Sequence, residues 1–230
     1  LETRWIAPTP RAGEPRLRFN WNTPLHLSTH EPGTLYVGAQ YLFRTRDQGQ
    51  SWERLSPDLT TNDPRKQQQE QSGGITVDNS DAETHTTIFT IAESPRDARV
   101  LWVGTDDGNL QLSRDGGRTW TNVAPNVKGV PRGTWVSHVH ASAHDAATAY
   151  VTFDGHMAGD MRAYVARTTD HGRTWTMLAT PEVRGFAHVI KQDPVVPTLL
   201  YLGTEHGLWI SNDGGARWAR FAGGEFPAHV

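Results

Sequence analysis

The sequence predicts an all-β protein, a β-propeller with four visible four-stranded antiparallel blades. Three observations favour this fold class. A turn motif that ends in tryptophan occurs four times, and strand-like apolar runs flank each copy. The motif tryptophans, Trp52, Trp120, Trp175 and Trp218, are 68, 55 and 43 residues apart, and tandem units of this period are the signature of propeller blades. The composition, with 22 Gly, 14 Pro and 9 Trp in 230 residues, is usual for short strands joined by turns.

Composition also narrows the classes of function. The chain has no cysteine, which excludes disulfide scaffolds, thiolate metal sites and cysteine nucleophiles. Its formal net charge is −3 and no basic run stands out, so we expect no nucleic-acid partner. No apolar run approaches the length of about 18 residues that a membrane-spanning helix needs, so we also expect no membrane span.

Each copy of the motif has a hydroxyl residue, followed by Asp, Gly and Trp two, four and seven positions later. The copies occupy residues 45–52, 113–120, 168–175 and 211–218. The shared residues are Asp47, Gly49 and Trp52 in the first copy, Asp115, Gly117 and Trp120 in the second, Asp170, Gly172 and Trp175 in the third, and Asp213, Gly215 and Trp218 in the fourth.

A motif between two strands is a hairpin turn, and its residues fit that role. Glycine supplies the positive φ of a tight turn, and the Asp carboxylate accepts backbone N–H groups of its own turn. We expect the tryptophan to wedge between neighbouring sheets, where truncation to alanine costs about 3–5 kcal/mol. An Asp beside a Gly also fits a catalytic or calcium-binding role. Because the same Asp recurs once in every repeat, we interpret all four as structural.

The four copies divide the chain. We predict blade 1 at residues 16–57, blade 2 at 85–124, blade 3 at 125–180 and blade 4 at 181–224, with a tail at 225–230. Residues 58–84 form a polar insertion between blades 1 and 2, either a plain surface loop or a loop over the ligand face. Residues 1–15 are either a linker or the closing strand of a preceding blade, because Pro and Gly interrupt them.

Four blades are the lower limit for a closed ring. The chain starts at Leu1 rather than Met and stops after a closing strand, and open end blades would expose apolar flanks and sheet edges. We therefore expect that the remaining blades of a longer polypeptide, or another polypeptide, pack against the first and fourth repeats.

The motif resembles the Asp-box, or BNR repeat, of sialidase-like and sortilin-like β-propellers. From about residue 16 to residue 222 the chain is similar to large bacterial repeat proteins of the sortilin-like or glycosyl-hydrolase-like family. The matching stretches are residues 18–24 (RFNWNTP), 55–62, 72–75, 102–109, 149–156 and 202–207.

This resemblance implies a longer protein with more blades and an extracytoplasmic location, whether secreted, periplasmic or at the cell surface. Similar propellers include xyloglucan-cleaving glycoside hydrolases and the peptide-binding luminal domain of sortilin, so the resemblance implies carbohydrate binding, protein binding or hydrolysis. In the hydrolases a pair of Asp residues outside the Asp-boxes acts as acid and base. No motif in this chain assigns those two positions.

Topology gathers the candidate functional residues on one face of the disc. The motif turns join third strands to fourth strands, so they lie on one face, and the turns between second and third strands lie on the opposite face. The latter turns carry our candidate catalytic carboxylates, Asp106, Asp107, Asp154 and Glu205. Turns also favour Asp followed by Gly for backbone reasons alone.

Imidazole and indole groups supply the candidate ligand contacts. These are His156 and His206 in the same turns, and Trp135, His138 and His140 on the inner strand of blade 3. An inner-strand histidine is also compatible with a structural role, and core packing is the commoner use of tryptophan. We predict no cofactor and no metal ion, although Asp, Glu and His on one rim are residue types that also bind a divalent cation.

Three functions fit these observations. We favour a non-catalytic binding propeller, part of a larger exported protein, that recognises a glycan or a protein through the face opposite the Asp-boxes. The alternatives are a xyloglucanase-like or sialidase-like glycoside hydrolase and a structural subunit of a larger assembly. In a hydrolase, carboxyl groups about 5–5.5 Å apart suit a retaining mechanism and groups about 6.5–9.5 Å apart suit an inverting one.

Overall fold

The structure is a computed structural model that describes residues 5–68 and 84–222. Most of the predicted insertion at 58–84, the predicted tail at 225–230 and the first four residues of the segment 1–15 lie outside the described residues. Residues 5–15 contain no strand.

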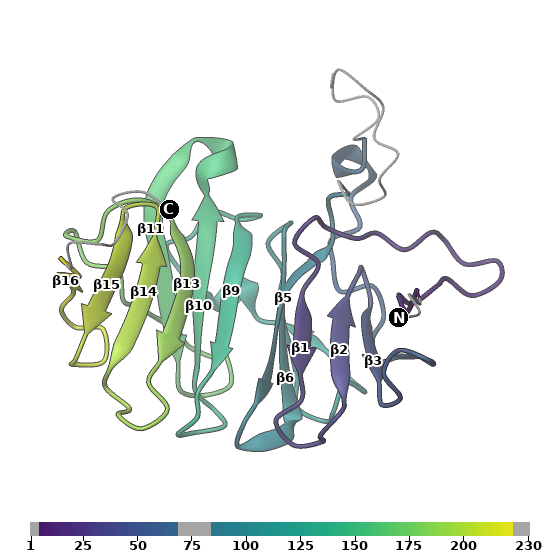
Figure 1. The fold of residues 1–230 in the computed structure, drawn as a ribbon. Helices are drawn as coiled ribbons and strands as arrows, with labels where there is room; N and C mark the ends of the chain where they lie inside the picture. The colour runs from purple at the N-terminus through teal and green to yellow at the C-terminus, as the bar shows by residue number, and fades with distance from the viewer. Residues whose placement is uncertain (1–4, 69–83, 223–230) are drawn as a thin grey trace.

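Four four-stranded antiparallel sheets make up the described part of the chain (Figure 1), which confirms the all-β propeller prediction. Each sheet is formed by consecutive strands in sequence order, and we number the sheets as blades 1 to 4. Blade 1 contains β1 (Leu25–Leu27), β2 (Leu35–Gly38), β3 (Leu42–Thr45) and β4 (Glu53–Arg54). Blade 2 contains β5 (Ile88–Ser94), β6 (Asp97–Thr105), β7 (Leu110–Ser113) and β8 (Thr121–Asn122).

Blade 3 contains β9 (Trp135–Ala141), β10 (Ala149–Gly155), β11 (Asp160–Thr168) and β12 (Thr176–Met177), and blade 4 contains β13 (Ala187–Gln192), β14 (Leu200–Thr204), β15 (Gly207–Ser211) and β16 (Ala219–Arg220). Short 3-10 helices occur at η1 (Pro64–Lys66), η3 (Ala124–Asn126) and η4 (His156–Ala158). The first strands of the blades, β1, β5, β9 and β13, lie side by side along the inner face (Figure 1).

Apolar side chains fill the space between neighbouring blades. Tyr36 and Leu42 of blade 1 pack with Ile88 of blade 2. Trp102 of blade 2 packs with Val136 of blade 3 in the next cluster. A third cluster of the same kind joins blades 3 and 4. The middle strands are buried on both faces, as the continuous apolar run in β6 predicts, because each blade is covered on two sides.

The four repeat turns join β3 to β4, β7 to β8, β11 to β12 and β15 to β16, and they share one hydrogen-bond pattern. In the turn at 168–175, Thr168 Oγ1 accepts from the backbone N–H of Gly172 at 2.9 Å and donates to Asp170 Oδ1 at 2.8 Å. Asp170 also accepts from the N–H and the hydroxyl of Thr174 at 2.9 and 2.6 Å. The hydroxyl and the carboxylate of the motif are thus satisfied within the turn itself.

The motif glycine sits where the preceding blade presses on the turn. Gly172 has φ +75°, and a Cβ added there would lie 3.0 Å from Val123, which follows β8. Gly117 and Gly215 make the equivalent approach to Leu55 after β4 and Leu178 after β12. The turn of blade 1 follows the same rule, because a Cβ added at Gly49 would lie 2.7 Å from the side chain of Ile6.

The motif tryptophans of blades 1 and 4 donate across the junction to the preceding segment, whereas Trp120 and Trp175 donate to Gly117 and Gly172 of their own turns at 3.0 and 3.1 Å. Trp218 is 8% exposed, and its Nε1 donates to the carbonyl of Leu178 at 2.9 Å. Trp52 donates in the same way to the carbonyl of Ile6 at 2.6 Å. Ile6 therefore occupies, on blade 1, the position that Leu178 occupies on blade 4.

The free face of blade 1 is apolar. Leu25 and Leu27 of β1 are 67% and 69% exposed. A groove of about 720 Å³ lies over this face and is lined by Leu25, Val37, Trp52 and the segment from Trp5 to Pro10, among others.

None of the helices in residues 5–68 and 84–222 has the length and apolar character that crossing a membrane requires.

Replacing a motif glycine with alanine tests two constraints on that position, the positive φ and the close approach of the preceding blade. Gly117→Ala should lower the free energy of unfolding by about 1–2 kcal/mol for the positive φ and by about 1–3 kcal/mol more for crowding against Leu55. Gly116→Ala is the matched control, because Gly116 has φ +74° and no atom within 4 Å of an added Cβ. Urea unfolding of both variants gives the comparison, and equal losses of stability would show that the contact with blade 1 contributes nothing.

The repeat turns should also make stability depend on pH. Hydrogen bonds, first from a side-chain hydroxyl in three turns and from Arg217 in the fourth, lower the pKa of Asp47, Asp115, Asp170 and Asp213 to about 2. Because the folded pKa lies below the unfolded value of about 3.9, this stabilisation is present above about pH 4 and is lost as the pH falls towards 2. The thermal midpoint of Asp115→Asn should therefore fall less steeply with acid than that of the unchanged chain. Parallel curves would mean that Asp115 is not held as an anion.

Candidate functional site

The turns between second and third strands lie at the opposite end of the blades from the repeat turns, on the upper side of Figure 1. They join β6 to β7, β10 to β11 and β14 to β15. Asp106 and Asp107 lie in the first turn, and Glu205 and His206 lie in the third. In blade 3, Asp154 was predicted in the turn but belongs to β10, whereas His156 begins η4 in the connection to β11.

Asp106 is fully buried, and its carboxylate is occupied by neighbours. It accepts from the N–H and the hydroxyl of Thr87 at 2.8 and 2.6 Å, and from the side-chain amide of Asn20 at 3.2 Å. His85 Nδ1 lies 3.4 Å away. This carboxylate ties blade 2 to the segment that precedes β1, so it has no face open to a substrate.

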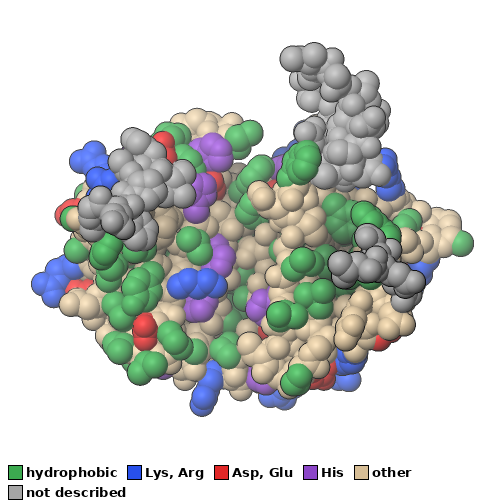
Figure 2. All heavy atoms as spheres, viewed as in Figure 1, with side chains coloured by type: hydrophobic (Ala, Val, Ile, Leu, Met, Phe, Trp, Pro, Cys, Tyr) green, Lys and Arg blue, Asp and Glu red, His purple; other side chains and the backbone are tan. Residues whose placement is uncertain are grey.

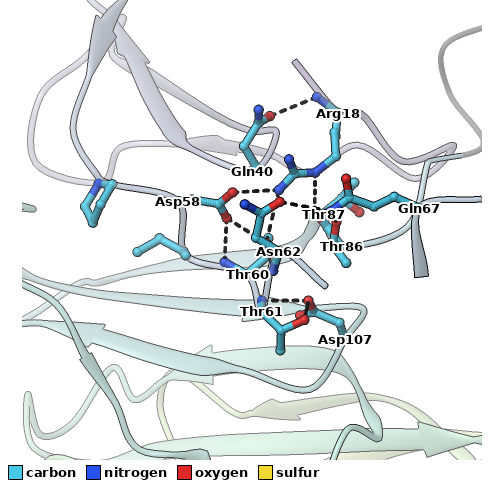
Figure 3. Close-up of polar contacts among 12 residues, drawn as sticks. Arg18, Gln40, Asp58, Thr60, Thr61, Asn62, Gln67, Thr86, Thr87 and Asp107 are labelled. Atoms are coloured by element: carbon cyan, nitrogen blue, oxygen red, sulfur yellow. Dashed lines mark hydrogen bonds and ion pairs between the residues drawn. The ribbon is translucent and has the colours of Figure 1, made fainter. Parts of the chain in front are cut away.

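Asp107 is 1% exposed and has a similar role at the junction of blades 1 and 2. It accepts from the N–H and the hydroxyl of Thr61 at 2.7 and 2.6 Å, and from Thr105 Oγ1 at 2.5 Å. Figure 3 shows Thr61 and Asp107 facing each other across this junction.

A salt bridge anchors the same segment. Arg18 Nη2 donates to Asp58 Oδ2 at 2.7 Å, and Arg18 Nε donates to the carbonyl of Thr86 at 3.1 Å (Figure 3). The described start of the insertion is therefore fastened to both blades. We did not single out these residues from the sequence, although they lie within or beside the stretches 18–24 and 55–62 that carry the family resemblance.

A different arrangement occurs at the junction of blades 3 and 4. Asp154 is 6% exposed and accepts from the backbone N–H of His156 at 2.9 Å. Its Oδ1 lies 2.6 Å from Nδ1 of the same histidine, and its Oδ2 lies 3.7 Å from Nδ1 of His188. Phe186 stacks on the ring of His156 with centroids 4.4 Å apart and meets His188 edge-on at 4.8 Å. We call these four residues the blade 3–4 cluster.

Glu205 and His206 adjoin this cluster. Glu205 donates its backbone N–H to the carbonyl of Phe186 at 3.1 Å. Its carboxylate lies 3.7 Å from His206 Nε2, and both side chains are partly exposed. Unlike Asp106 and Asp107, Glu205 is therefore accessible.

Trp135 lies beside the cluster on the next strand. It is paired with Asp154 in the β9–β10 register. Its ring centroid lies 5.5 Å from Phe89 and 5.9 Å from His85, so it is part of a half-buried aromatic group.

His138 and His140 lie further along β9, on the inner face rather than on the rim. Their rings stack with centroids 6.5 Å apart and planes at 17°. Desolvation, with a smaller contribution from Lys191, lowers the pKa of His138 to about 3 and that of His140 to about 4. Both rings are therefore neutral at pH 7 in the chain alone.

The structure thus separates the predicted residues. It brings Asp154, His156, Glu205 and His206 together and keeps Asp106 and Asp107 in buried networks. Sequence reasoning missed Phe186 and His188. Phe186 directly precedes β13 and His188 is the second residue of that strand, so both lie at the rim. Within the described residues, no group of three or more His, Asp or Glu side chains is arranged to hold a metal ion. An Asp–His pair beside aromatic rings can orient an imidazole and present hydrogen-bonding edges next to a stacking surface.

Comparison with solved structures shows the β-propeller fold. An ancestral GH74 enzyme matches with a TM-score of 0.64 and 14% identity, over 90% of this chain and 25% of that chain. The GH74 xyloglucanase from Xanthomonas campestris matches with a TM-score of 0.60 and 22% identity, over 86% and 29%. A chain of the COPII outer coat vertex matches with a TM-score of 0.55 and 11% identity, over 88% and 47%.

The chain therefore spans between about a quarter and a half of the length of these structures. No family model matches it, and no curated protein matches it in sequence. At these identities the likeness establishes the fold and does not establish the Asp-box or sortilin-like type.

The two kinds of carboxylate should respond differently to neutralisation. Asp107→Asn places an amide against the donors of Thr61 and Thr105, and each lost hydrogen bond to a buried charge costs about 1.5–3 kcal/mol. Glu205→Gln is the control at a partly exposed site and should leave stability nearly unchanged. Thermal unfolding measures both, and a normal midpoint for Asp107→Asn would contradict a structural role for this residue.

Proposed function

We propose that this chain is the ligand-binding segment of a larger exported β-propeller of the Asp-box, sortilin-like type. Its ligand is a glycan, which it recognises on the face opposite the repeat turns. The proposed binding surface is the blade 3–4 cluster with Glu205, His206 and Trp135 at its edges.

The blade 3–4 cluster is the observation that carries this proposal. The rings of His156 and His188 are partly exposed, the buried Phe186 packs against both of them, and Asp154 fixes the orientation of His156 through its Nδ1. Pyranose rings bind through apolar faces and hydroxyl edges, so rings beside carboxylate and imidazole groups suit them.

The contacts of Ile6 support a larger propeller. Ile6 packs on Gly49 and accepts from Trp52, as Leu178 does for Gly215 and Trp218. Residues 5–8 thus occupy the place of the end of a preceding blade. The apolar groove on blade 1 and the exposed Leu25 and Leu27 suit a further blade packed on that side.

Glycoside hydrolysis is the second candidate, and one observation favours it. Asp154 near the end of β10 and Glu205 in the β14–β15 turn lie at the same end of neighbouring blades, and each has an imidazole beside it, whereas Asp106 and Asp107 accept from threonine hydroxyl and backbone donors. These two residues are therefore our candidates for acid and base, whereas Asp106 and Asp107 would act only as structural groups.

Affinity electrophoresis in gels that contain soluble polysaccharides, xyloglucan among them, tests the proposal. We expect at least one glycan to retard the chain, and we expect His188→Ala to weaken that binding about tenfold, which corresponds to about 1.4 kcal/mol. Arg118→Ala, in a repeat turn on the opposite face, is the matched control and should bind normally.

The same mixtures are assayed for new reducing ends. Their release, lost in Asp154→Asn, would replace the binding proposal with the hydrolase. Failure to bind any glycan, or equal weakening by Arg118→Ala and His188→Ala, would contradict a glycan site on this face and favour a structural subunit.

A further inference from the structure

Basic and imidazole side chains gather on the inner face, away from the blade 3–4 cluster. Figure 2 shows His side chains, with a Lys or Arg side chain among them, over the inner strands. His138 and His140 come from β9, and Lys191 comes from β13, which packs directly against β9.

Two ring nitrogens in this group have no hydrogen-bond partner. Nδ1 of His138 and Nε2 of His140 are both buried and have no partner among residues 5–68 and 84–222. A buried polar atom without a partner loses its hydration and gains nothing in return, so these nitrogens mark a place where a partner is missing.

The surrounding charge is positive. Desolvation is the main cause that lowers the pKa of His26, His138 and His140, and the charge of Lys191 adds a smaller lowering at each, so its ammonium group acts on histidines of both β1 and β9. Lys191 is exposed at the surface of the inner face, and partial desolvation lowers its pKa. Lys191 forms no ion pair with any residue in 5–68 or 84–222.

The other titratable groups around the two rings do not supply an anion. Tyr150 of β10 lies 6.4 Å from the ring of His140, and desolvation raises its pKa. Glu93 of β5 is the nearby carboxylate on the inner face, but it raises the pKa of His26 and not that of either β9 histidine.

Blades 1 and 2 repeat the local structure of blades 3 and 4, which gives an internal comparison. In the first pair, Glu93 accepts from Ser28 Oγ at 2.8 Å and from the Tyr36 hydroxyl at 2.9 Å. In the second pair, Gln192 takes the place of Glu93. Its Oε1 accepts from Ser142 Oγ at 2.6 Å, and its Nε2 donates to the Tyr150 hydroxyl at 3.0 Å.

The matching histidines strengthen this equivalence. His30 and His144 each bond through Nε2 to a backbone carbonyl of the next blade, at 2.8 and 2.9 Å. His26 and His140 stand four positions before them on the two inner strands.

The two pairs of blades differ in charge at two adjacent residues, 92–93 in β5 and 191–192 in β13. The first pair has an anion, Glu93, and a small neutral residue, Ala92, immediately before it. The second pair has neutral Gln192 preceded by Lys191. In the first pair, Nε2 of His26 accepts from the backbone N–H of Glu93 at 3.2 Å. In the second pair, the ring of His140 interacts with the backbone of Gln192, but its Nε2 has no partner among the described residues. The second pair therefore gains a cation and loses the internal carboxylate.

We infer that the inner face between β9 and β13 binds an oxyanion, a carboxylate or a phosphate group, held by Lys191 and by the rings of His138 and His140. An oxyanion accepts hydrogen bonds from the ammonium and imidazole groups together, and its charge compensates the unpaired lysine. A cation is not the occupant, because Lys191 would repel it. This inference is independent of the glycan site, since it uses none of the residues of the blade 3–4 cluster.

Ring NMR signals of the histidines test this inference. The chain is titrated with sodium phosphate and, separately, with sodium acetate, both at constant ionic strength set with sodium chloride. We expect a saturable shift of the His138 and His140 ring resonances with at least one anion, with little response from His30. The comparison of phosphate with acetate identifies which source of oxyanion fits.

Lys191→Ala is the matched variant, because it installs the residue that the equivalent position of blade 2 already holds. It should weaken the binding at least about tenfold, the loss expected for one charge-assisted contact. Lys128→Ala, an exposed lysine outside this group, should leave it unchanged. A linear response to both anions, or the same binding constant in Lys191→Ala with an unchanged thermal midpoint, would overturn the inference.

Discussion

The contact between each repeat turn and the blade before it is the constraint on which the structure depends. The turn needs a glycine whose φ is positive and whose missing Cβ leaves room for an apolar side chain of the preceding blade, as Gly172 does for Val123. The hydroxyl and the carboxylate of the motif then satisfy the backbone N–H groups that this sharp turn exposes. A single unit of eight residues thereby folds its own hairpin and fixes its neighbour, which explains why the motif recurs once in each blade while the intervening sequence varies.

The carboxylates that stabilise the fold and those proposed to bind a ligand lie in different parts of the molecule. The repeat turns occupy one end of the blades and use their carboxylates internally. At the opposite end, Asp106 and Asp107 are also used internally, where they join blades 1 and 2. In the part of the chain that the structure describes, the junction of blades 3 and 4 combines a carboxylate, two partly exposed imidazoles and a buried phenyl ring, so the proposed recognition of a glycan depends on this junction and not on the whole rim.

The sequence was sufficient to predict the fold, because a turn motif of fixed composition recurs and strand-like runs flank each copy. It also predicted that Asp154, His156 and Glu205 lie at one end of the blades, since topology alone assigns the connections between second and third strands to one face. It did not distinguish Asp154 from Asp106, because that distinction depends on Thr87 and Asn20, which are distant in sequence from the turn. Phe186 and His188 were missed for a related reason, since their contact with His156 crosses between two blades. The equivalence of Lys191 and Ala92 became visible only when two pairs of blades were compared in space.

We conclude that the repeat turns are junctions of the folded core and not surface loops. Native-state hydrogen exchange of the motif glycine amides tests this conclusion. The amide protons of Gly117, Gly172 and Gly215 are expected to exchange only through global unfolding, with the same free energy as the central strands. Exchange of these amides through local opening, with strands such as β6 and β10 still protected, would contradict it.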